Sequence, residues 1–190
     1  MNPNTGFWNT GVMDVPRITG TTPAVMDCHE VRDICAQLGI ALPFPSLLDV
    51  GCGTGRCYQL AGLYRGVDIS PSAVRYGQER GLQVSLIDGP DSLDAFASDS
   101  SDWVLAWSVF THIGRPEQVA YLAQFARIAP HVLVDILPDD PGRTAARWGC
   151  DAAVFRQDME AAGYAISPVE PELVDRQGWA RHRYFRGTRR

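Results

Sequence analysis

The stretch that decides the fold is Leu47-Leu48-Asp49-Val50-Gly51-Cys52-Gly53-Thr54-Gly55-Arg56, residues 47 to 56. An apolar run with an acid near its end is followed at once by three glycines that alternate with other residues. Such a run predicts a buried strand that turns sharply into a helix. Glycine lets the backbone adopt the conformations of a tight turn and lets a ligand approach the main chain closely. The stretch therefore predicts a ligand-binding turn after a buried strand.

A second acid, Asp68, indicates which kind of ligand the turn binds. It closes the next predicted strand, residues 64–69, and lies nineteen residues after Asp49. In a doubly wound sheet, an acid at the end of the second strand hydrogen-bonds the ribose hydroxyls of a nucleotide cofactor. The turn and Asp68 together favour a cofactor that contains adenosine. A tight structural turn without a ligand is the alternative.

The motif LLDVGCGTGR at residues 47–56, together with Asp68, resembles the class I S-adenosylmethionine-dependent methyltransferase family of the small-molecule type. The resemblance extends from about residue 46 to residue 190. It implies S-adenosyl-L-methionine as the cofactor, with the glycine turn under its methionine part and Asp68 on its ribose. A nicotinamide-dependent Rossmann enzyme is a competing interpretation, but its G-x-G-x-x-G spacing would need a glycine where Arg56 stands.

Strand and helix patterns alternate along the chain. Helices are expected at residues 23–39, 56–63, 70–80, 116–128 and 151–162, and strands at 47–50, 64–69, 82–87, 102–107, 131–137, 164–169 and 179–185. The alternation predicts an α/β fold with a doubly wound parallel sheet. The resemblance implies a Rossmann-like seven-stranded sheet with a terminal antiparallel hairpin. We expect an N-terminal lid segment and helix in residues 1–45 and the methyltransferase domain in residues 46–190.

Length and composition fit a globular protein that acts on a small molecule. The chain has 190 residues, 45% of them hydrophobic, and a formal net charge of −5. A protein that binds a polyanion needs a cationic surface, so nucleic acid is not expected as a partner. No apolar run approaches the roughly 20 residues that span a membrane, and the first residues lack a signal-peptide pattern. We expect a cytoplasmic protein without a membrane partner, and the oligomeric state stays open.

The cysteines and basic residues limit the chemistry. Five cysteines are present, an odd number, and none forms a C-x-x-C pair. This pattern argues against a zinc knuckle and against a disulfide framework, so we expect reduced thiols. All 17 basic residues are arginine, so a proton acceptor must be a His, Asp, Glu, Tyr or Cys side chain.

The candidates for cofactor binding lie at predicted strand ends. The resemblance places Asp49 near the methionyl amino group or makes it a support of the turn, and both roles stay open. It places Asp88 on the adenine amine, Gly89 beside the ring and Ile69 against the base. Asp88-Gly89 is also an ordinary turn sequence, and Trp107 could equally fill the core. The full set is Asp49, Gly51, Cys52, Gly53, Gly55, Asp68, Ile69, Asp88, Gly89, Trp107 and Ser108.

Methyl transfer is expected beside residues 107–113, where the chain leaves the fourth strand. His112 is the candidate general base, because a hydroxyl of low acidity gains from a proton acceptor within hydrogen-bond reach. A histidine here could instead border the cofactor or cap the following helix. We predict methylation of a small-molecule acceptor, with a hydroxyl favoured over an amine or a carbon. A non-catalytic cofactor-binding module of the same fold is the alternative from a different class.

Three acids, Asp135, Asp139 and Asp140, lie at or just after the end of the fifth strand. Their oxygens could hold Mg²⁺ and so orient vicinal hydroxyls. A solvated acidic loop is the simpler interpretation, and no metal is predicted. Much of the acceptor pocket is expected to come from the leading segment, residues 1–22, and from the loop at residues 138–150.

Overall fold

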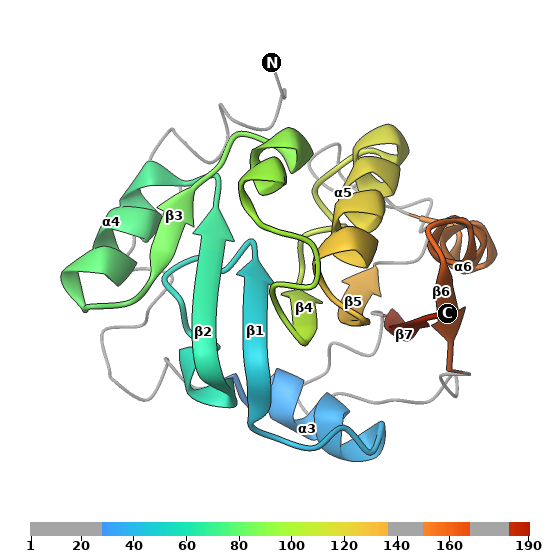
Figure 1. Ribbon diagram of the computed structural model, residues 1–190, viewed down its shortest axis with the longest axis horizontal. Coiled ribbons are helices and arrows are strands. Elements are labelled where there is room, and N and C mark those ends of the chain that lie inside the picture. Colours follow the sequence, from blue (N-terminus) through green and yellow to red (C-terminus); the bar gives the residue numbers. More distant parts are fainter. Residues whose placement is uncertain (1–27, 137–149, 168–182) are drawn as a thin grey trace, which may run out of the picture.

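The computed structural model describes residues 28–136, 150–167 and 183–190 (Figure 1). Within these ranges the chain forms one sheet of seven strands in the order β3-β2-β1-β4-β5-β7-β6. Strands β1 to β5 pair in parallel, whereas β7 is antiparallel to both β5 and β6. The expected α/β fold, with seven strands and an antiparallel end, is confirmed.

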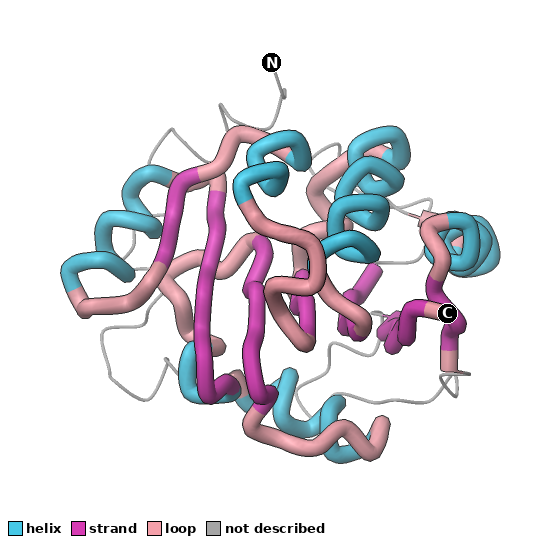
Figure 2. Tube along the Cα trace, viewed as in Figure 1, coloured by secondary structure: helices cyan, strands magenta, loops and turns pink. Residues whose placement is uncertain are grey.

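Most bounds lie close to those expected; the exceptions are one connection described below and the last strand, which was predicted at residues 179–185 and ends at Arg189. The strands are β1 (Phe44–Val50), β2 (Ala61–Asp68), β3 (Val84–Leu86), β4 (Trp103–Ala106), β5 (His131–Ile136), β6 (Tyr164–Ile166) and β7 (Arg183–Arg189). The helices are α3 (His29–Gln37), α4 (Pro71–Glu79), α5 (Arg115–Ile128) and α6 (Ala152–Ala161), with the short 3-10 helices η2 (Tyr58–Leu60) and η3 (Pro90–Ala95). Figure 2 shows the strands side by side with helices around them.

Helices cover both faces of the sheet. Apolar residues of α5 and α6, among them Phe125 and Phe155, pack in one cluster with β1, β4 and β5. Ile34 and its neighbours on α3 pack in a second cluster with the other face. Helix α4 lies on the α3 side, because it packs through Val74 against Val84 and the partly buried Tyr64, which also contacts the α3 cluster. The sheet is therefore buried between two helical layers, as parallel sheets require.

Local signals place α4 where the sequence predicts it. The Ser70 hydroxyl accepts a hydrogen bond from the amide of Ala73 at 3.4 Å, and Pro71 occupies the first helical position. Serine as cap and proline at this position are typical of a helix start. Gly81 follows the helix with φ +78°, a left-handed conformation common after helices. This start of α4 lies directly after Asp68 at the end of β2.

The helix predicted at residues 56–63 is wrong. Only the short turn η2 forms there, and β2 already begins at Ala61. Strand β1 starts at Phe44, before the expected residue 47, and Phe44 pairs with Ala61. Hydrogen bonds between the extended strands therefore outweigh the local helical pattern. Figure 2 shows the connection from β1 to β2 as a loop followed by a short helical segment.

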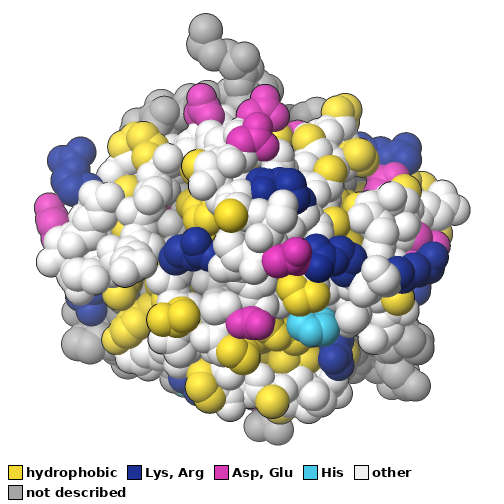
Figure 3. All heavy atoms as spheres, viewed as in Figure 1, with side chains coloured by type: hydrophobic (Ala, Val, Ile, Leu, Met, Phe, Trp, Pro, Cys, Tyr) yellow, Lys and Arg dark blue, Asp and Glu magenta, His cyan; other side chains and the backbone are white. Residues whose placement is uncertain are grey.

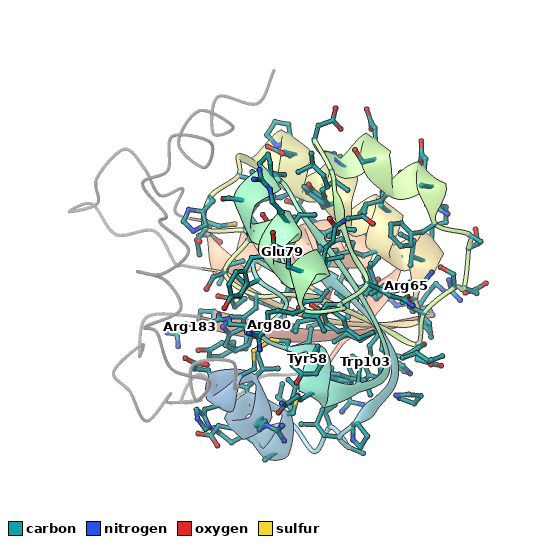
Figure 4. All side chains as sticks on the ribbon, turned by 90° about the vertical axis from the view of Figure 1, so that its left-hand side faces the viewer. Tyr58, Arg65, Glu79, Arg80, Trp103 and Arg183 are labelled. Atoms are coloured by element: carbon teal, nitrogen blue, oxygen red, sulfur yellow. A yellow bond between two sulfur atoms is a disulfide. The ribbon has the colours of Figure 1, made fainter. Side chains whose placement is uncertain are left out.

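The expectation of reduced thiols is wrong for one pair of cysteines. Cys28, which precedes α3, forms a disulfide with Cys57, which precedes η2, and their Cα atoms are 5.4 Å apart. The two residues are 29 positions apart and meet only because α3 packs against the connection after β1, so no spacing pattern announces the pair. Figure 4 shows Tyr58, the residue after Cys57, close to α3. The other three cysteines, Cys35, Cys52 and Cys150, are buried thiols outside the disulfide.

Candidate active site

The candidate site lies at the carboxyl edge of the sheet, where β1 and β2 end at the top of Figure 1. The amides of Gly51 and Cys52 donate to the carbonyl oxygen of Val67 at the end of β2, at 2.8 and 3.0 Å. On the other side, a Cβ atom on Gly51 would lie 2.3 Å from Cγ2 of Val109, which follows β4. The glycine turn thus contacts the ends of both neighbouring strands, the usual place of a ligand in a doubly wound sheet.

Asp68 and the glycine turn are in direct contact. The amide of Gly53 donates to Oδ2 of Asp68 at 2.7 Å, and the amide of Ser70 donates to Oδ1 at 2.8 Å. Burial raises the pKa of the Asp68 carboxyl, while these amide hydrogen bonds favour its charged form. Each carboxylate oxygen has two lone-pair directions, so acceptor capacity remains on both for the hydroxyls of a ligand. The structure brings together the two features that the sequence motif paired.

Gly53 presents bare main chain at this edge. Its φ is +56°, and a Cβ atom built there has no described atom within 4 Å. The other two glycines of the motif make room for protein atoms instead: Gly51 for Val109, and Gly55 for Leu82, whose Cδ1 would lie 2.6 Å from an added Cβ. Of the three positions, only Gly53 faces space that no described atom fills and that a ligand could enter.

Asp49 is a buried acid beneath the turn, with 3% of its surface exposed. Its Oδ2 accepts a hydrogen bond from the Tyr64 hydroxyl at 2.9 Å. Burial raises the pKa of Asp49 to about 7, while this hydrogen bond and the charge of Arg56 act in the opposite direction. Burial also raises the pKa of the Cys52 thiol beside the pair, so that thiol is neutral. Tyr64 was not among the candidates from sequence, because a strand tyrosine gives no local sign of its partner.

The residues predicted for adenine lie at the ends of β2 and β3. Asp88 follows β3, and the Ser92 hydroxyl donates to its Oδ1 at 2.5 Å. Gly89 precedes η3. Ile69 packs against the apolar cluster on the α5 side of the sheet. The structure therefore places these residues beside the end of β2 that carries Asp68, and their contact with a base stays a prediction.

Tyr121 is a second residue that sequence reasoning missed. It lies on α5 and is buried, with 3% of its surface exposed. Burial raises the pKa of its phenol, and the charges of Glu117, Asp68 and Asp88 act in the same direction. The phenol of Tyr121 is therefore within electrostatic range of Asp68 and Asp88, the two acids predicted to bind the nucleoside. The helical spacing of apolar residues on α5 concealed it among core positions.

Ser108 has an unusual backbone conformation at the end of β4. Its φ is +59°, and its amide donates to Oδ1 of Asp135 at 2.5 Å. A non-glycine residue in this region costs roughly 1–3 kcal/mol, and such strain is concentrated at functional sites. The preceding Trp107 stacks on Tyr184 of β7, with ring centroids 5.2 Å apart. Trp107 and Ser108 thus lie at the predicted strand end, beside the glycine turn that Val109 contacts.

Asp135 supports the turn at Ser108, which is a role other than the metal ligation considered from sequence. Its side chain is fully buried and accepts the Ser108 amide. Asp139 and Asp140 lie outside the described residues, as do residues 1–22 and 138–149 of the expected acceptor pocket. In the ranges that the structure describes, no group of three His, Cys, Asp or Glu side chains could hold a metal ion.

His112 lies on the segment between β4 and α5. It is half-buried, and its amide donates to the carbonyl oxygen of Val109 at 2.9 Å. The hydroxyl of Thr111 donates to the carbonyl oxygen of Ser108 at 3.1 Å. These bonds fold the segment into a compact turn at the same edge of the sheet as the glycine motif. The role of His112 as a base stays a prediction.

The described surface carries charges of both signs. On the face drawn in Figure 3, arginine and acidic side chains are interspersed among apolar and neutral ones rather than gathered into one basic patch. Among the helices in the described ranges, none is both long and apolar enough to cross a membrane.

Comparisons with known proteins point to one class. The family described as a methyltransferase domain matches residues 47–130, while none of the curated proteins matches the chain significantly. Magnesium protoporphyrin IX methyltransferase from Synechocystis PCC 6803, with bound SAH, is similar in structure, with a TM-score of 0.73, 19% identity and coverage of 98% of each chain.

Two further solved structures share the fold. A TehB-like SAM-dependent methyltransferase from Corynebacterium glutamicum has a TM-score of 0.63 and 18% identity, with coverage of 85% of this chain and 87% of that one. A SAM-dependent methyltransferase from Thermotoga maritima, described as a possible histamine N-methyltransferase, has a TM-score of 0.62 and 18% identity, with coverage of 85% and 89%.

Fold and site together define a class I methyltransferase fold: a parallel sheet with a reversed β7, and a glycine turn bonded to the acid of the next strand. A methyltransferase domain is matched over residues 47–130, and the fold is that of the class I, S-adenosylmethionine-dependent methyltransferases. The resemblance noted from the sequence is confirmed.

Proposed function

We propose that the chain transfers a methyl group from S-adenosyl-L-methionine to a hydroxyl of a small-molecule acceptor. The observation that carries the proposal is the bond between the Gly53 amide and Asp68, with open space over Gly53. This arrangement pairs a main-chain surface that a ligand can approach with a carboxylate that retains acceptor capacity for ribose hydroxyls. When bound, S-adenosylmethionine supplies an electrophilic methyl group.

The residues at four strand ends divide the contacts to the cofactor. Asp68 binds the ribose hydroxyls, Asp88 accepts a hydrogen bond from the adenine amine, and Asp49 faces the methionyl amino group. The family resemblance implies these assignments, and the order of the strand ends along the edge of the sheet supports them. The remaining contacts are assigned to Gly51, Cys52, Gly53, Gly55, Ile69, Gly89, Trp107 and Ser108.

His112 is the proposed proton acceptor. With the cofactor bound, its sulfonium would give up the methyl group and keep the bonding electron pair, and the imidazole of His112 would take the proton that the attacking hydroxyl loses. A positioned base contributes typically about 10² to 10⁴ in rate. The hydrogen bonds of Ser108 to Asp135 and of His112 to Val109 fix this segment, which supports alignment of the base.

An amine acceptor is the second candidate. It is favoured by the likeness in fold to the structure described as a possible histamine N-methyltransferase. A neutral amine is a stronger nucleophile than a neutral hydroxyl, so it attacks without prior loss of a proton and depends less on His112. The rate of His112→Ala distinguishes the two: a large loss favours a hydroxyl, and a small loss favours an amine.

A pair of glycine substitutions tests the cofactor site. Gly53 and Gly81 both have positive φ, +56° and +78°, and neither has a described atom within 4 Å of an added Cβ. An alanine at either position therefore adds a similar backbone strain of roughly 1–2 kcal/mol. Only Gly53 lies at the proposed site, so Gly81→Ala is the matched control.

The assay is calorimetric binding of S-adenosylmethionine and S-adenosylhomocysteine. We expect Gly53→Ala to bind both at least about tenfold more weakly, a loss of about 1.4 kcal/mol, while Gly81→Ala binds as the wild type does. Equal affinities of the two variants would contradict the placement of the ligand over Gly53. Absence of binding to the wild type would refute the proposed function itself.

A further inference from the structure

The hydroxyl of Tyr64 can contact Asp49 because Gly66, which lies between them, has no side chain. In the pairing of β1 with β2, Leu47 lies opposite Tyr64 and Asp49 lies opposite Gly66. Residues two apart in a strand share a face, so the Tyr64 ring leans forward over Gly66. A Cβ atom on Gly66 would lie 2.9 Å from the Tyr64 hydroxyl and 2.7 Å from Sγ of Cys52. Any side chain at position 66 would therefore displace the tyrosine.

The hydrogen bond between Tyr64 and Asp49 lies inside the protein, directly under the glycine turn. The Tyr64 hydroxyl would be 3.5 Å from a Cβ atom on Gly55, and Asp49 is 3% exposed. Hydrogen bonds to a charged group in such a place are stronger than those in water. The bond therefore orients the Asp49 carboxyl group and favours its charged form.

The surroundings of Asp49 balance its two protonation states near neutral pH. Burial favours the neutral acid and raises its pKa to about 7, and the charge of Asp68 acts in the same direction. The Tyr64 hydrogen bond and the charge of Arg56 favour the carboxylate. The thiol of Cys52 is neutral, and β4 places the apolar Leu105 beside Asp49. A small change in hydrogen bonding therefore changes how much of the carboxylate is present.

We propose that Tyr64 is a positioning residue for the cofactor, because its hydroxyl holds the Asp49 carboxylate charged and oriented for the cationic amino end of S-adenosylmethionine. The inference rests on the proposed function. It makes cofactor affinity dependent on pH, since an ammonium group binds the carboxylate and not the neutral acid. Affinity then falls about tenfold per pH unit once the pH is below the midpoint of Asp49.

The test measures the affinity for S-adenosylhomocysteine by calorimetry between pH 5.5 and 7.5, where the amino group of the ligand stays mainly protonated. Tyr64→Phe keeps the ring and removes the donor. Tyr76→Phe is the matched control, because Tyr76 lies on α4 and its hydroxyl meets Arg80. We expect the affinity of the wild type and of Tyr76→Phe to rise with pH and to level off near pH 7. The affinity of Tyr64→Phe should still rise steeply there and should be about fivefold lower than that of the wild type at pH 7.

Two further measurements keep the inference testable if Tyr64→Phe binds too weakly to follow. Asp49→Asn has no titrating group at this position, so its affinity should lack the part of the pH dependence that Asp49 causes. In the ligand-free protein, ¹³C NMR of the Asp49 carboxyl should give a higher midpoint in Tyr64→Phe than in the wild type. Superimposable pH profiles of Tyr64→Phe and Tyr76→Phe, or equal NMR midpoints, would overturn the inference. A wild type that binds no S-adenosylhomocysteine at any pH refutes the proposed function instead.

Discussion

The disulfide between Cys28 and Cys57 leads to a quantitative prediction about stability. The two cysteines are 29 positions apart in the sequence. In the chain-entropy treatment, a cross-link over such a loop removes about 2.1 + 1.5R ln 29, or about 12 cal/mol/K, from the unfolded chain. At 25 °C this corresponds to about 3.6 kcal/mol of stability. That is a large share of the roughly 5–15 kcal/mol by which a domain is stable.

Both cysteines are buried in the apolar cluster that joins α3 to the sheet, with 1% and 3% of their surfaces exposed. Replacement of both by alanine keeps most of this packing and removes the cross-link. We therefore expect the double variant Cys28→Ala/Cys57→Ala to lose about 3–4 kcal/mol in its free energy of unfolding. The same loss should follow when the wild type is treated with a dithiol, which reduces the disulfide to two thiols.

The measurement is equilibrium unfolding in urea at 25 °C, with and without the dithiol. Cys35→Ala is the matched control, since Cys35 is a buried free cysteine on the same helix. That variant should lose only the packing of one sulfur and should stay sensitive to the dithiol. A double variant within about 1 kcal/mol of the wild type, or a wild type that the dithiol leaves unchanged, would refute the reasoning.

Three further predictions concern the site. Replacing His112 by alanine should lower kcat with a hydroxyl acceptor by about 10² or more. The affinity for S-adenosylhomocysteine should stay within about twofold of the wild-type value. A fall in affinity equal to the fall in kcat would contradict the role of His112 as a base. Replacing Asp135 by alanine should lower the free energy of unfolding by about 1–3 kcal/mol, because the Ser108 amide loses its acceptor. Asp135→Asn should lower it less, since its amide oxygen can still accept the hydrogen bond. Thermal or urea unfolding measures both. The raised pKa of Asp49 costs stability above its ordinary value of 3.8, because the unfolded chain then loses a proton that the folded chain keeps. This loss of stability is absent below about pH 4, grows up to about pH 7 and is constant above it. Asp49→Asn should therefore be more stable than the wild type by up to about 4 kcal/mol at pH 8 and by less at pH 5. A difference in urea unfolding that does not change with pH would contradict this.

Local chemistry made most of the fold predictable. Ser70 and Pro71 start α4, and Gly81 follows its end, because a side-chain cap, a fixed φ and a positive φ each act within a few residues. The alternation of such helices with apolar strands was enough for a parallel sheet. The antiparallel end of the sheet came from the family resemblance, since strand order depends on contacts between residues far apart in the chain.

The parts that could not be predicted depend on tertiary contacts. The start of β2 at Ala61 follows from its pairing with Phe44, so the local pattern of residues 56–63 was misleading. The bond from Tyr64 to Asp49 needs the register of two strands and the missing side chain of Gly66. The spacing of Tyr64 and Gly66, two apart in a strand, is the one sequence signal that could have indicated a shared face.

The short connection after β1 explains why α3 and the disulfide occur together. Residues 51–60 join two neighbouring parallel strands, a crossover that usually contains an α-helix, but here they contain only η2. The sheet face that such a helix would cover carries Leu47 and Leu105, and Val31 and Ile34 of α3 pack in the same cluster with them. Helix α3 precedes β1, so it could separate from the sheet without breaking the β1–β2 connection. The bond from Cys28 to Cys57 joins it covalently to that connection, and the packing that supports the glycine turn therefore includes a helix from before the first strand.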